Sequence, residues 1–139
     1  MGKKRSTKEL NLSSNERLYL KKNQKKLFKF PLVKNLTTKY ANFYTFHAGF
    51  KRKLEDLLIV VFNNPSLVAT AYSKTSTPSA PIIWDKKNNR GLCKVLIVNS
   101  GNANAHTGKE GIAEIEKYVS EASKYFNCSK NQILVSSTG

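Results

Sequence analysis

The string Asn-Ser-Gly-Asn-Ala-Asn-Ala at residues 99–105 is the part of the sequence whose residue types most suggest chemistry. Asparagine amides donate and accept hydrogen bonds, so they can line a ligand site or brace a loop against its own backbone. Gly101 allows a positive φ, and the small alanines allow other backbone to approach closely. The string lacks the spacing of a phosphate-binding loop and has too few glycines for a dinucleotide fingerprint. From spacing alone, a structural turn is favoured over a ligand site.

The cysteines and histidines do not have the spacing of a metal or redox site. Cys93 and Cys128 lie far apart and form no CxxC pair, and neither His47 nor His106 has ligand spacing with them. We therefore expect two reduced, buried thiols and no metal site.

The Asn-rich string is expected between a strand and a helix, a position that ligand sites in α/β proteins favour. Residues 94–99 are almost entirely apolar, which predicts a buried strand. Residues 108–126 predict a helix, with Thr107 and Glu110 at capping-box spacing. One stripe of this helix carries Ile112, Ile115, Val119, Ala122 and Phe126.

A further strand begins at Ile133 and is expected to stop at Ser136-Ser137-Thr138-Gly139, which by itself indicates an ordinary strand-ending turn. Strand, loop, helix and strand together predict an α/β unit of layered architecture.

Upstream, the pattern predicts a hairpin and a short helix, with organised structure beginning near Tyr44. Residues 57–62 form a continuous apolar run, typical of a buried strand, and Asn63-Asn64-Pro65-Ser66 has the composition of a turn. Residues 66–72 then predict the returning strand. Ser79 is expected to cap a short helix with Pro81 in its first turn and Ile82, Ile83 and Trp84 on its buried side.

The charge is concentrated near the start of the chain. The formal net charge is +15, and residues 1–34 hold eleven basic residues against two acids. We expect residues 1–39 to be a flexible basic lead-in and residues 40–139 to be the folded part. A nucleic-acid-binding arm is the alternative, because lysines interleaved with Tyr19, Phe28 and Phe30 could grip phosphates and stack bases. No apolar run approaches the roughly 20 residues that cross a bilayer, so no membrane span is expected.

The string at residues 99–105, followed by Thr107-Gly108, closely resembles the signature of the ornithine acetyltransferase (glutamate N-acetyltransferase) family. Three flanking matches stand in the same order: Ala48-Gly49-Phe50-Lys51 with Asp56-Leu57-Leu58, then Ala80-Pro81-Ile82, then Ser137-Thr138-Gly139. The similarity covers about residues 44–139. Thr70 and Tyr72-Ser73 depart from the pattern, where the family commonly has Gly and Phe-Thr, and His106 occupies a variable position.

The resemblance implies part of a layered αββα sandwich, incomplete here. It also implies a self-cleaving, cytoplasmic enzyme of arginine biosynthesis that uses no cofactor and no metal. The family moves an acetyl group from N-acetylornithine to glutamate through an acetyl-threonine, and that threonine begins the second subunit produced by cleavage. This chain would be the front portion, inactive alone, with no nucleophile among its threonines. The alternative function is a small basic nucleic-acid-binding protein, which would explain only the basic lead-in. Otherwise nucleic acid is not an expected partner beyond nonspecific binding by that segment.

Residue roles follow from the same resemblance. Thr138 and Gly139 match the family's oxyanion-hole pair, in which a hydroxyl and a backbone N–H stabilise the tetrahedral intermediate. A loop that supports this site is expected from residues Asn99, Ser100, Gly101, Asn102 and Asn104.

Overall fold

The computed structural model describes residues 34–139 as one five-stranded sheet with helices on one face. The strand order is β1-β2-β3-β4-β5, antiparallel from β1 to β4 and parallel between β4 and β5. The strands are β1 (Lys34–Thr37), β2 (Ala41–Phe46), β3 (Leu57–Leu67), β4 (Leu92–Ser100) and β5 (Ile133–Thr138). The helices are α2 (Ala80–Asn88), α3 (Gly108–Tyr125) and the short 3₁₀ turn η1 (Lys130–Gln132).

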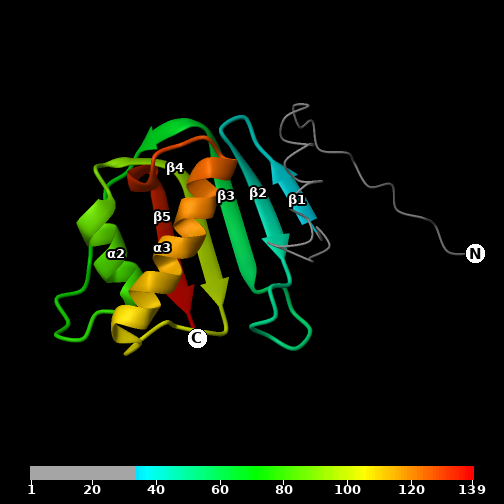
Figure 1. The fold of residues 1–139 in the computed structure, drawn as a ribbon. Coiled ribbons are helices and arrows are strands. Elements are labelled where there is room, and N and C mark those ends of the chain that lie inside the picture. Colours follow the sequence, from blue (N-terminus) through cyan, green and yellow to red (C-terminus); the bar gives the residue numbers. More distant parts are fainter. Residues whose placement is uncertain (1–33) are drawn as a thin grey trace, which may run out of the picture.

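The fold class is α/β, as predicted. Both helices pack against β5 on the same face of the sheet, whereas β1 and β2 carry no helix within the described residues (Figure 1). The expected lead-in, residues 1–39, lies mostly outside the described part of the chain, as does the alternative nucleic-acid-binding arm. The last residues of the expected lead-in are not a flexible segment, because residues 34–37 form strand β1 and pair with β2. Ordered structure therefore begins before Tyr44.

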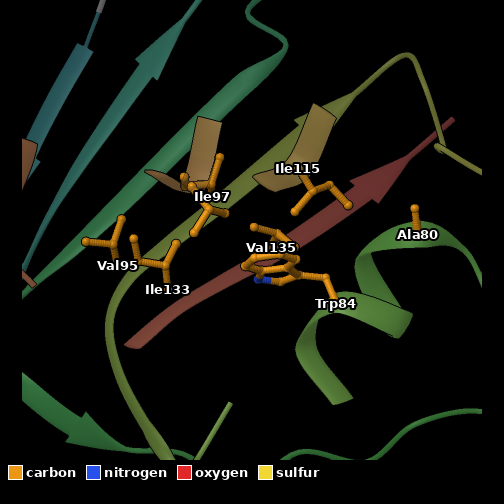
Figure 2. Packing of buried hydrophobic residues seen from close by; sticks show 8 residues of the cluster. Ala80, Trp84, Val95, Ile97, Ile115, Ile133 and Val135 are labelled. Carbon is orange, nitrogen blue, oxygen red and sulfur yellow. The ribbon is translucent and has the colours of Figure 1, made fainter. Parts of the chain in front are cut away.

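The core lies between the two helices and the sheet. Trp84 of α2 points toward Val135 of β5, and Ile115 of α3 lies over the same strand (Figure 2). The stripe expected on α3 is confirmed, since Ile115 and Val119 are fully buried and the other members pack against the core. Burying such side chains contributes about 1.5–3 kcal/mol each, so this contact fixes the helices on the sheet.

The expected hairpin at residues 63–72 is wrong. β3 continues to Leu67 through Asn63-Asn64-Pro65, and residues 68–72 form no strand. A register shift between Val61 and Ser66 absorbs the turn-forming residues, after which pairing with β4 resumes. The Asn63 backbone N–H donates to the Tyr40 carbonyl, and the Lys94 ammonium donates to the Asn63 carbonyl. Contacts with the β1–β2 turn and with β4 thus satisfy the groups that a turn would have used.

The helix at residue 80 is confirmed, but two of its details differ from the prediction. Ser79 makes no capping hydrogen bond. Ile83 is exposed, and the buried side consists of Ala80, Pro81, Trp84 and Asp85. No helix in residues 34–139 is long and apolar enough to span a membrane.

Candidate functional site

Two strand ends place the predicted site at one edge of the sheet. Because β4 and β5 are parallel, Asn99 pairs with Ser137 and Ser100 pairs with Thr138. The Asn-rich loop and the Ser-Thr-Gly string, far apart in sequence, therefore leave the sheet side by side (Figure 1). Residues 136–138 belong to β5 itself, so the turn expected there is wrong.

Direct hydrogen bonds join the loop to β5. The Gly101 N–H donates to the Thr138 carbonyl at 2.9 Å, and the Ser137 hydroxyl donates to the Asn99 side-chain oxygen. Thr138 and Gly139 are exposed, and the Thr138 hydroxyl makes no hydrogen bond to any other residue in the described part of the chain. The backbone of Thr138 is thus held while its hydroxyl is available as a donor.

The asparagine amides brace the loop from inside. The Asn99 amide donates to the Asn102 carbonyl at 2.7 Å, and the Asn102 side-chain oxygen accepts the Asn104 N–H at 3.0 Å. Asn104 has φ of 49°, and its carbonyl accepts the Ala80 N–H at the start of α2. These groups hold the loop rather than aim into open space. That the loop supports a functional site stays a prediction.

Thr107 does not form the predicted capping box. It has helical φ and ψ, and α3 has no side-chain cap. Its hydroxyl instead donates to the Asn104 side-chain oxygen at 2.6 Å. A Cβ added to Gly111 would lie 2.0 Å from that hydroxyl oxygen, so only glycine fits there. The Asn-rich loop thus packs onto the first turn of α3.

Gly101 has φ of +100°, which confirms the expected positive φ. A Cβ there would lie 3.1 Å from the Cβ of Phe50 and 3.1 Å from the Cγ of Lys51. Both neighbours belong to the loop between β2 and β3. This segment is therefore a third component of the same edge of the sheet.

Asp56 holds that third segment, a role that the sequence analysis did not predict although Asp56 stands in the family resemblance. Its side chain is fully buried, and its carboxylate accepts the backbone N–H groups of Ala48 and, at 2.7 Å, Lys51. Burial raises the pKa of Asp56, but these donors and the nearby His47 outweigh it, so the pKa lies below its ordinary value. An acid directly before an apolar run gives no sequence signal for such a role.

His47 lies beside Asp56. Its Nδ1 is 2.8 Å from the Leu54 carbonyl oxygen and 3.6 Å from a carboxylate oxygen of Asp56. Both neighbours are acceptors, so Nδ1 carries a proton.

The remaining candidates form no site. Both cysteines are free thiols, and burial raises the pKa of Cys93 to about 11 and that of Cys128 above its ordinary value. His106 is exposed, with φ of 58°. Within residues 34–139, no three His, Cys, Asp or Glu side chains lie together so that they could hold a metal ion.

Comparisons with known proteins identify the family of this chain. The model of the ArgJ family matches residues 42–139. The arginine biosynthesis bifunctional protein ArgJ of Agrobacterium fabrum is 40% identical over 94 residues, covering 66% of this chain and 23% of that protein. Its counterpart in Bradyrhizobium diazoefficiens is 39% identical over 97 residues, covering 68% and 24%. The chain thus spans about a quarter of the length of the curated relatives that it matches.

Two solved structures share the fold. The arginine biosynthesis bifunctional protein argJ of Bacillus halodurans superposes with a TM-score of 0.69 at 28% identity, covering 81% of this chain and 62% of that one. The ornithine acetyltransferase of Mycobacterium tuberculosis complexed with ornithine superposes with a TM-score of 0.63 at 26% identity, covering 80% and 63%. From the family match, the relatives and the shared fold together, the chain belongs to the ArgJ family.

Proposed function

We propose that residues 42–139 are the front part of an acetyltransferase of arginine biosynthesis, and that they supply its oxyanion hole. The observation that carries this proposal is the strand end at Thr138. Its backbone is fixed by Gly101, whereas its hydroxyl is exposed and unbonded within the described residues. A fixed donor beside a glycine N–H suits a reaction in which a carbonyl oxygen gains negative charge.

The proposed reaction moves an acetyl group from N-acetylornithine to glutamate. A threonine that begins the second subunit attacks the acetyl carbonyl, with its own amine as base, and the amide C–N bond breaks so that ornithine leaves as the free amine. The amine of glutamate then attacks the acetyl-threonine ester, which gives N-acetylglutamate and restores the threonine hydroxyl. That threonine matches no residue of this chain, so its self-cleavage and its acetyl-enzyme belong to sequence beyond Gly139. The ornithine in the Mycobacterium tuberculosis structure supports this substrate class. A cytoplasmic location is part of the proposal, as the resemblance implies.

The test is substitution of Thr138 in an enzyme that continues beyond Gly139 to the nucleophilic threonine. Loss of one oxyanion donor typically lowers turnover by about 10²–10³-fold, because the donor binds the transition state better than the substrate. Thr138→Ala should therefore lower kcat strongly and change KM little, and Thr138→Ser, which keeps the hydroxyl, should lose much less. Turnover is measured per folded, cleaved molecule. An alanine variant within a few-fold of the wild type would show that Thr138 is only a strand-end residue.

A second test uses the 139-residue chain alone. Without the nucleophile it should form no acetyl-enzyme when incubated with N-acetylornithine. Intact-mass spectrometry checks this, with the longer enzyme as the positive control. A stable acetyl adduct on any threonine of this chain would contradict the proposed division of roles.

A further inference from the structure

Asp56 connects three segments that meet at the site edge. Its N–H donates to the Phe46 carbonyl at the end of β2, and its own carbonyl accepts the Ser100 N–H at the end of β4. Its carboxylate accepts the N–H groups of Ala48 and Lys51 in the loop between β2 and β3. One buried residue therefore holds two strand ends and a loop.

Two routes lead from Asp56 to Thr138. The first runs along the backbone, from the Asp56 carbonyl to the Ser100 N–H and on to Gly101. The second runs through the loop, whose Phe50 and Lys51 occupy the space where a side chain at Gly101 would begin. Both routes end at the Gly101 N–H, which bonds the Thr138 carbonyl at 2.9 Å.

Apolar packing does not hold this loop in place. Phe50 is 46% exposed and Leu54 is 66% exposed, and Gly49 has φ of +92°. A segment with so little buried surface opens easily unless specific bonds close it. Hydrogen bonds to a charged carboxylate are about twice as strong as neutral ones, so the two bonds to Asp56 are the main restraint on its shape.

We propose that Asp56 is a positioning residue that fixes the strand end carrying Thr138 and Gly139, acting through Ser100 and through the contact of Phe50 and Lys51 with Gly101. This inference rests on the proposed oxyanion role of that strand end. Asp56 itself does not reach substrate, because its side chain is fully buried and both carboxylate oxygens accept bonds within the protein. Its effect is geometric: a donor loses its preference for the transition state when it is free to move.

Asp56→Asn in the 139-residue chain tests the connection directly. The amide keeps the size of the side chain but removes its charge and turns an NH₂ toward one of the two N–H donors. Hydrogen exchange at the Gly101 amide should accelerate by about 10- to 100-fold beyond any change at core amides of β4 and α3, which report only the change in global stability. Glu55→Gln, which removes the neighbouring charge, is the matched control and should leave Gly101 unchanged. Unaltered exchange at Gly101 in a folded Asp56→Asn variant would overturn the proposal.

Native-state exchange of the unmodified chain keeps the proposal testable if that variant does not fold. The amides of Ala48, Lys51, Ser100 and Gly101 should open together in low denaturant, with one free energy of opening, before α3 opens. A Gly101 amide that opens independently of Ala48 and Lys51 would overturn the proposal.

Turnover in the longer enzyme separates this inference from the proposed function. Asp56→Asn should lower kcat by about 10-fold or more with a smaller change in KM, because only the fixed geometry of the donors is lost. If Thr138→Ala retains turnover, the oxyanion role fails. The exchange at Gly101 still decides by itself whether Asp56 fixes this strand end.

Discussion

The two aspartates buried in the described part of the chain are held in opposite ways. Asp56 is 2% exposed and accepts two backbone N–H groups from a loop that wraps around its carboxylate. Asp85, on α2, is 8% exposed and accepts only the Val135 N–H of β5, at 3.2 and 3.4 Å from its two oxygens. The donors lower the pKa of Asp56 despite its burial, whereas burial raises the pKa of Asp85 to about 7.

The difference teaches that burial alone does not decide the state of a carboxylate. What decides it is the number and closeness of the donors that replace water. Asp85 has only one donor, the Val135 N–H, in place of water. The indole Nε1 of Trp84, the preceding residue, is also buried and has no hydrogen-bond partner within residues 34–139. The loop around Asp56 therefore stabilises a charged carboxylate, whereas the surroundings of Asp85 destabilise one.

The largest expected effect is that of Asp56→Ala. It leaves two loop N–H groups without their acceptor, and each such buried group costs about 1–3 kcal/mol. We expect the free energy of unfolding to fall by about 3–5 kcal/mol, measured by chemical denaturation. Glu55→Ala, which removes the half-buried acid next in sequence, should stay within about 0.5 kcal/mol of the wild type. Equal losses of stability in the Asp56→Ala and Glu55→Ala variants would show that the bonds to the Asp56 carboxylate add no special stability.

Asp85→Asn should stabilise the protein at alkaline pH. The folded protein holds the Asp85 proton more tightly than the unfolded chain, so wild-type stability falls as pH rises from about 4 to about 7. Asparagine can still accept the Val135 N–H and carries no charge. We expect a gain of about 2 kcal/mol at pH 8, after discounting for the solvent that still reaches the carboxylate, and little change near pH 4. Thermal melts at both pH values check this, and a destabilised variant at pH 8 would contradict it.

Gly101→Ala should disturb the site region without touching either carboxylate. Alanine is strained at φ of +100°, and its Cβ would press on the Phe50 carbonyl oxygen at 3.2 Å. The expected cost is about 1–2 kcal/mol. Gly91→Ala is a suitable control, because Gly91 also has a positive φ, +84°, but has open space around it. A smaller loss at Gly101 than at Gly91 would show that the loop against Gly101 yields readily.

The smallest expected effect is the change in stability of the wild type and of Asp56→Asn at acidic pH. The stability that Asp56 contributes is present above its ordinary pKa and is lost as pH falls through its lowered folded pKa. Wild-type stability should therefore decline below about pH 4, and Asp56→Asn should decline less over the same range. Denaturant midpoints between pH 2 and pH 5 measure both slopes. Parallel slopes would show that Asp56 gains nothing from its charge.

The elements with strong hydrophobic periodicity were predicted correctly. Their apolar residues are the ones that pack into the core, so the pattern in the sequence and the burial in the structure coincide. The stripe on α3 and the apolar runs of β3 and β4 are examples. The hairpin failed because turn chemistry at residues 63–66 is local information, whereas the Asn63 and Lys94 bonds involve the β1–β2 turn and β4. The capping box failed for a similar reason, since the Thr107 hydroxyl bonds to the Asn104 side chain instead.

The site was predictable only in part. The Asn-rich string and Ser137-Thr138-Gly139 were identified through the family resemblance, and the parallel pairing of β4 with β5 brings them together. Their catalytic roles stay a prediction. Phe50 and Asp56 stand in the family resemblance, but their structural roles and that of His47 could not be inferred, because those roles depend on how a loop folds back over a strand end.

The parallel pairing of β4 and β5 has a consequence for the order of folding. β2 and β3 are consecutive strands joined by the loop at residues 47–56, so their contacts are local and can form early. β5 can pair with β4 only after all of α3 has crossed between them, which makes that closure non-local and slow. We therefore expect the edge that carries Thr138 to be completed last, once the rest of the sheet already exists as a template for it.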